Sequence, residues 1–161
     1  MVKERYVRNM QQARTSNVRQ LHSLKLLGSG LDIDKSHFIP ELTETVLGRW
    51  FYGEALLFSS DGCRDSLRDI EETMTEFHAH FGEIYAAYYG RRAGGLLGLI
   101  GLKREIPQAQ TAKIRRHYDE MVLLCDRLRR QMNRLENIMA ELPDETFFRL
   151  SRMPKKSLRS A

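Results

Sequence analysis

The most constraining feature of this sequence is an unbroken heptad repeat of apolar residues in its C-terminal half. The repeat consists of Ile114, Tyr118, Met121, Cys125, Leu128, Met132, Leu135, Met139 and Leu142. Successive members are alternately four and three residues apart, which places them on one face of an α-helix. Flanking Val122, Leu124 and Ile138 widen this face beyond the seam of a two-stranded coiled coil. The pattern predicts a long helix between Pro107 and Pro143 that packs inside a helical bundle.

A second heptad repeat predicts another long helix, over residues 63–88. Its members are Cys63, Leu67, Ile70, Met74, Phe77, Phe81, Ile84 and Tyr88. Two shorter apolar stripes predict helices over residues 3–27 and 38–57. The first stripe is Val18, Leu21, Leu24 and Leu27, and the second is Ile39, Leu42, Val46, Trp50 and Leu57. Because no segment alternates as a strand does, we predict an all-α fold, an antiparallel four-helix bundle with long third and fourth helices.

The charge of the chain is unevenly distributed. The 161 residues contain 26 basic and 21 acidic side chains, and five of the basic ones lie in residues 149–161, which contain no acid. The sequence therefore predicts a nearly neutral bundle over residues 1–148 and a basic, disordered tail over residues 149–161. We expect contact with nucleic acid or an anionic membrane only through this tail.

Composition and segment lengths indicate a cytoplasmic protein. Two cysteines, Cys63 and Cys125, are too few for a disulfide framework, and both fall on predicted core positions. No run of about 20 apolar residues could cross a bilayer, and the N-terminus does not have the pattern of a signal peptide. The glycine-rich segment 93–102 fits either a buried connector or an exposed apolar loop that contacts a partner or a membrane surface.

The search for catalytic motifs indicates that the protein is not an enzyme. The sequence contains no glycine-rich nucleotide loop, nucleophile elbow, HExxH motif or paired carboxylates at a useful spacing. Histidines are the remaining candidates for metal binding, namely His22, His37, His78, His80 and His117. Of these, His37 and His117 are expected at solvated or capping positions.

One segment resembles a known family. Residues 45–54, TVLGRWFYGE, resemble the Cys-x-Phe-Gly-x-Trp-x-Tyr-Gly-Glu signature of the chemoreceptor zinc-binding (CZB) domain, and residues 70–78 resemble its Leu-Glu-Glu-Pro-His-x-x-Phe-His segment. The resemblance covers about residues 15–85. CZB domains are helical sensory domains that are attached to bacterial chemoreceptors and diguanylate cyclases or stand alone. The resemblance implies four zinc-ligand positions in this chain, at His22, Thr45, Met74 and His78.

Two of these four positions hold residues that bind zinc poorly. Thr45 replaces the signature cysteine and Met74 replaces a histidine, whereas structural zinc requires four thiolate, imidazole or carboxylate donors. We therefore expect zinc to be weakly bound or lost, with His22 and His78 as the remaining ligands. The resemblance implies a non-enzymatic sensory or regulatory bundle that acts by conformational change on a signalling partner in chemotaxis or cyclic-di-GMP signalling. The wide apolar stripes of the fourth predicted helix favour a homodimer.

Two alternatives stay open at this point. The first is a metal- or haem-binding four-helix bundle that uses His22 and His78 with new donors. Within the third predicted helix, Glu76 with His80 and Met74 with His78 each have the i, i+4 spacing that lets two side chains reach one atom. The second alternative is a nucleic-acid or membrane adaptor that works through residues 149–161.

Overall fold

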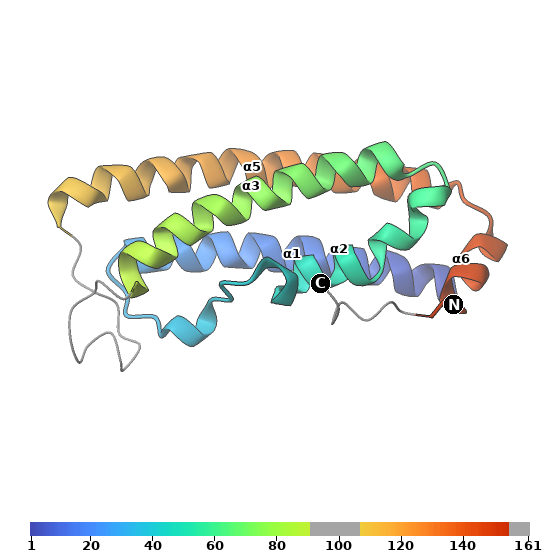
Figure 1. The fold of residues 1–161 in the computed structure, drawn as a ribbon, viewed down its shortest axis with the longest axis horizontal. Coiled ribbons are helices and arrows are strands. Elements are labelled where there is room, and N and C mark those ends of the chain that lie inside the picture. Colours follow the sequence, from blue (N-terminus) through green and yellow to red (C-terminus); the bar gives the residue numbers. More distant parts are fainter. Residues whose placement is uncertain (91–106, 155–161) are drawn as a thin grey trace.

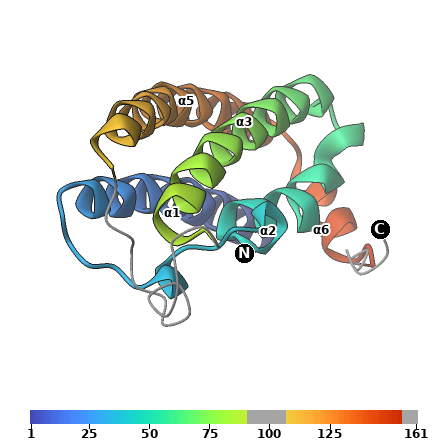
Figure 2. The ribbon, with the colours of Figure 1, turned by 60° about the vertical axis from the view of Figure 1, so that its left-hand side comes forward.

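Three long helices form the body of the protein (Figure 1). They are α1 (Val2–Gly28), α3 (Arg64–Tyr89) and α5 (Gln108–Ala140) in a computed structural model that describes residues 1–90 and 107–154. The most extensive contact between helices joins α3 to α5, which run antiparallel (Figure 1). Helix α1 runs alongside this pair and contacts α5 (Figures 1 and 2). The described residues contain no strand, so the predicted all-α class is confirmed.

The two heptad repeats account for the helix packing. All eight repeat positions of residues 63–88 are buried, and so are the six from Met121 to Met139 in α5. Ile114, Tyr118 and Leu142, at the ends of the second repeat, are half-buried. Of the residues expected to widen the α5 face, Leu124 is buried, but the side chain of Val122 is 41% exposed. The α5 stripe is therefore narrower than predicted.

The buried face of α1 differs from the predicted one. Its buried residues are Tyr6, Met10, Ala13, Asn17, Leu24 and Leu27, so the N-terminal half of the helix also contributes to the core. Val18, which the sequence placed in the core stripe, is 48% exposed. The reason is periodicity, because the spacing from Tyr6 through Asn17 is four, three and four residues, and Val18 lies one position off this series.

The helix predicted over residues 38–57 is wrong in its extent. Two short 3₁₀ turns, Lys35–His37 and Leu42–Glu44, precede the short helix α2 (Val46–Gly53), and a further 3₁₀ turn spans Ala55–Ser60. Thr45 caps the N-terminus of α2, since its hydroxyl accepts a hydrogen bond from the Gly48 amide at 2.9 Å. This late start leaves Ile39 and Val46 exposed instead of buried.

A short C-terminal helix was missed by the sequence interpretation. Helix α6 (Asp144–Ser151) follows Pro143 and buries Phe147 and Leu150 in the core. The Arg149 guanidinium also donates a hydrogen bond to Asp61 at 2.6 Å. Helix α6 thus contains Arg149, Leu150 and Ser151, the first three residues of the predicted tail, while the division of the chain at residue 148 stays a prediction. The predicted glycine-rich segment 93–102 and residues 155–161 of the tail lie outside the described residues.

The buried side chains form two apolar clusters along the bundle. One cluster joins the first half of α1 with α2, the start of α3, the end of α5 and α6, and the other joins the end of α1 with the end of α3 and the start of α5. On α1, the buried polar residue Asn17 lies between Ala13 of the first cluster and Leu24 of the second. In the described part of the chain, none of the helices combines the length and apolar character needed to cross a membrane.

Candidate functional site

The segment that resembles the CZB signature forms α2, which contacts both α1 and α3. Trp50 and Phe51 of α2 are buried in the first cluster, at 7% and 0% exposure. The next residue, Tyr52, donates a hydrogen bond from its hydroxyl to Glu71 of α3 at 3.0 Å. At the end of the helix, Glu54 accepts a hydrogen bond from the Asn9 amide of α1 at 2.9 Å. Helix α2 is thus attached to each neighbouring helix by a polar contact as well as by apolar packing.

The Tyr52 phenol stays protonated well above neutral pH. Burial, together with the hydrogen bond to the Glu71 carboxylate and its charge, raises the pKa of Tyr52 to about 12. The phenol therefore stays protonated and keeps donating to Glu71 at any physiological pH.

Thr45 and Met74 have structural roles at their positions. The Thr45 hydroxyl donates to the Leu42 carbonyl at 2.7 Å while it accepts from the Gly48 amide, so both hydrogen bonds serve the start of α2. The Met74 side chain is fully buried in the first cluster. Neither group is a strong zinc donor, because a threonine hydroxyl is neutral and a thioether is soft.

The two histidines of the predicted site lie in different surroundings. His22 is exposed on α1, whereas His78 is half-buried on α3, with its Nε2 atom 2.5 Å from the Pro40 carbonyl oxygen and its ring 5.1 Å from that of Phe81. Within residues 1–90 and 107–154, no hydrogen bond or ring contact joins any two of the four predicted ligand positions. These four residues do not supply the donor set of a structural zinc site, and the weak or lost binding of zinc stays a prediction.

The sequence interpretation missed a buried polar contact between α1 and α5. The Asn17 amide donates a hydrogen bond to the Cys125 thiol at 3.5 Å, and its Oδ1 atom has no partner among the described groups. Burial raises the pKa of the Cys125 thiol, and that of Cys63, which keeps both in the protonated form at neutral pH. This agrees with the interpretation of both cysteines as core residues.

A second missed feature is a pair of histidines between α3 and α5. The Nδ1 atoms of His80 and His117 are 2.8 Å apart, and the ring centroids are 5.1 Å apart. His117 is half-buried against α3, whereas the sequence predicted a solvated or capping position for it. Each histidine directly precedes a heptad residue, Phe81 and Tyr118 respectively, so the heptad register was the signal that could have placed them side by side.

The surroundings of His117 favour its neutral form. Its pKa lies below the usual 6.5, first because of burial and next because of His80, with Lys113 and Arg116 acting in the same direction and Glu83 of α3 opposing them. A group whose pKa is lowered by folding stabilises the fold above its unfolded pKa, and this stabilisation is lost as the pH falls through the folded value.

We therefore expect acid to weaken the contact between α3 and α5. Between pH 7.5 and pH 5, the free energy of unfolding of the wild type should fall more than that of His117→Gln, which cannot become charged. Urea unfolding at each pH, followed by circular dichroism, measures the difference. The exposed His37→Gln variant is the control and should follow the wild type. If the free energy of unfolding depends on pH in the same way in all three proteins, protonation of His117 does not weaken the contact between α3 and α5.

The fold and these contacts define an all-helical protein in which the short helix α2 is attached to the long helices α1 and α3. No family model matches the chain, and comparison with curated proteins and with solved structures also found no match.

Proposed function

We propose that this chain is a non-enzymatic sensory or regulatory bundle that resembles a CZB domain, with α1, α2, α3 and α5 as the four members of the bundle. The observation that carries the proposal is the position of the signature residues. Trp50 and Phe51 anchor α2 in the core, while Tyr52 and Glu54 hydrogen bond to α3 and α1. A residue pattern typical of a sensory domain thus coincides with the element that connects the other helices.

The proposed mechanism is a displacement of α2. A ligand or partner that binds a displaced form of α2 would shift the population towards that form, and the relative position of α1 and α3 would change with it. Helix α2 is short and is flanked by 3₁₀ turns, so its displacement breaks fewer contacts than a shift of a long helix would. We infer that a cytoplasmic signalling partner in chemotaxis or cyclic-di-GMP signalling detects this change.

We also propose that the protein acts as a homodimer. Two neighbouring apolar side chains on α5, Val122 and Leu123, are 41% and 63% exposed. Exposed apolar residues of this size on a long helix suit an interface between two copies.

The two hydrogen bonds of α2 provide a test. In the double variant Asn9→Ala/Tyr52→Phe, each lost bond should lower the free energy of unfolding by about 0.5–1.5 kcal/mol. Hydrogen exchange measured by mass spectrometry should be faster in residues 46–53 and unchanged in the middle of α3 and α5. Asn137→Ala, at an exposed position of α5, is the matched control and should leave exchange in α2 unchanged.

The functional part of the test uses cells of the organism that encodes the chain. Deletion of its coding sequence should alter motility bias or the cyclic-di-GMP concentration, and the wild type and Asn137→Ala should both restore the original level. The double variant should be folded and yet fail to restore it. If it complements fully while α2 exchanges faster, the proposed role of α2 is wrong; if deletion changes neither readout, the signalling role is wrong.

A further inference from the structure

Two imidazoles from different helices face each other at the contact between α3 and α5. His80 of α3 and His117 of α5 approach through their Nδ1 atoms, which are 2.8 Å apart and within hydrogen-bond distance. Histidine is the commonest metal ligand in proteins, and imidazole nitrogen suits copper, nickel and zinc. These histidines are separate from the four positions that the CZB resemblance implies.

We propose that His80 and His117 bind a divalent transition-metal ion that prefers square-planar geometry, with Cu(II) as the best fit. Two nitrogens in neighbouring corners of a square, each about 2.0 Å from the metal, are about 2.8 Å apart. This separation equals the one between the two Nδ1 atoms. A tetrahedral zinc ion would need about 3.3 Å between the same nitrogens, so the rings would have to separate by roughly 0.5 Å.

The histidine pair is held in place by its helices. Each ring is half-buried, and α3 and α5 make the most extensive helix contact in the described structure. The two ligands therefore come from rigid elements and lose little conformational freedom on binding. Because the two ligands come from different helices, metal binding also depends on the relative position of α3 and α5.

Metal binding requires a neutral imidazole, which offers a nitrogen lone pair to the metal. In the apo pair one Nδ1–H group donates to the other Nδ1 atom. When the metal binds, the donor ring shifts this proton to its own Nε2 atom, so both Nδ1 lone pairs face the metal and no proton is released.

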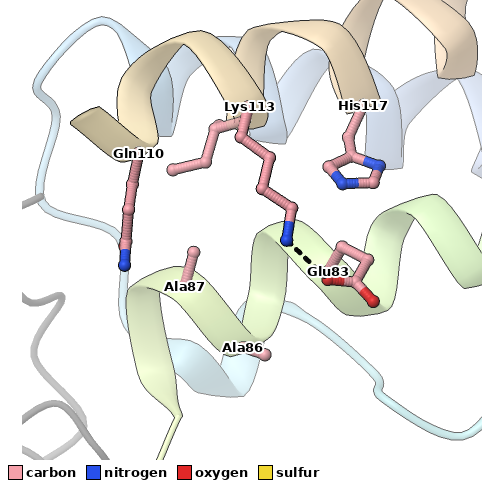
Figure 3. A pocket seen from close by; sticks show the side chains of 7 residues that line it. Glu83, Ala86, Ala87, Gln110, Lys113 and His117 are labelled. Atoms are coloured by element: carbon pink, nitrogen blue, oxygen red, sulfur yellow. Dashed lines mark ion pairs between the residues drawn. The ribbon is translucent and has the colours of Figure 1, made fainter. Parts of the chain in front are cut away.

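His117 also lines a pocket between α3 and α5. Figure 3 shows this pocket, of about 300 Å³, with Glu83 of α3 and Lys113 of α5 facing each other across it. Glu83 and Lys113 are 3.9 Å apart at their charged atoms and more than half exposed. Such a loose ion pair costs little to break, so Glu83 can turn towards the metal as a third donor while water supplies the fourth.

Charged side chains near the pair favour or oppose a bound cation. Glu76, one turn before His80, already pairs with Arg127 of α5 at 3.8 Å. Lys113 and Arg116 place positive charge on the α5 side and oppose a cation, whereas Glu83 favours it. In the described part of the chain, no three or more histidine, cysteine or acidic side chains already enclose a metal-sized space. The site is therefore a two-histidine site that Glu83 and water complete.

This proposal does not depend on the sensory role, and its test uses the purified full chain and CuCl₂. After treatment with a chelator, the protein is titrated with CuCl₂ in the presence of glycine, which competes for weakly bound copper. We expect one tightly bound Cu(II) per chain and an electron paramagnetic resonance spectrum with couplings to two imidazole nitrogens. Ni(II) and Zn(II) should bind more weakly.

Variants locate the site. His80→Ala and His117→Ala should each lower the Cu(II) affinity at least about tenfold, and Glu83→Gln should lower it less. His37→Ala, at an exposed position outside the pair, is the matched control and should bind as the wild type does. Circular dichroism and the fluorescence of Trp50, the single tryptophan, verify that each variant is folded.

Two results would overturn the proposal. The first is a wild-type spectrum without imidazole couplings, which decides the matter even if the alanine variants fail to fold. The second is an equal Cu(II) affinity in the wild type and in folded His80→Ala and His117→Ala proteins, which would mean adventitious surface binding only.

Discussion

Truncation of Phe51 to alanine should lower the free energy of unfolding by about 3–5 kcal/mol, the largest effect that we expect from a single substitution. Phe51 is completely buried and joins α2 to the first apolar cluster. Its ring lies 5.1 Å from that of Tyr52, at nearly a right angle. Loss of the ring removes apolar contacts and leaves a cavity that the neighbouring helices cannot fully close. Urea unfolding followed by circular dichroism at 222 nm measures the loss.

The matched control for this substitution is Phe148→Ala. Phe148 lies on α6 and is 50% exposed, so the same change there should alter stability by no more than about 0.5 kcal/mol. A small effect at Phe51, comparable to that at Phe148, would show that α2 does not contribute to the core as the structure indicates.

Replacement of Gly48 by alanine should lower the free energy of unfolding by about 1–3 kcal/mol. Gly48 lies in the first turn of α2, where an added Cβ atom would overlap the Leu42 carbonyl oxygen and lie 3.1 Å from the Thr45 hydroxyl. The obstacle is backbone, so the turn at Leu42–Glu44 and the start of α2 must move apart. Hydrogen exchange in residues 42–53 should increase together with the loss of stability.

Gly82→Ala is the control for this substitution and should have the opposite effect on the free energy of unfolding. Gly82 lies on the exposed side of α3, and a Cβ atom there meets nothing within 4 Å. Because alanine is a better helix former, this variant should be more stable than the wild type by about 0.8–1.0 kcal/mol. If Gly48→Ala also stabilises the protein, Gly48 does not lie as close to the Leu42 carbonyl oxygen as the structure indicates.

The long helices could be predicted because their signal is local and repetitive. In α3 and α5 the apolar residues recur at helical spacing, and a helix with one such face buries it whatever its partners are. The region before α3 has no such repeat. Its conformation depends on Pro40, on the cap at Thr45 and on side chains from α1 and α3, so a continuous helix over 38–57 was a reasonable but wrong prediction.

The candidate site was less predictable than the fold. The resemblance singles out residues 45–54, but the contacts of Tyr52 and Glu54 join residues 19 and 45 positions apart in the sequence. The His80 and His117 pair is separated by 37 positions. Sequence spacing describes which residues share a face of one helix, whereas contacts between helices also depend on how far each helix slides along the other.

The sequence by itself determined that this chain is helical and which faces of α3 and α5 are buried, because periodicity acts within single helices. Only the tertiary structure decided that α2 is short and bonded to two helices, that α6 completes the core, and that two histidines meet between α3 and α5. These features arise from the axial register and the rotation of packed helices, which many distant side chains set together.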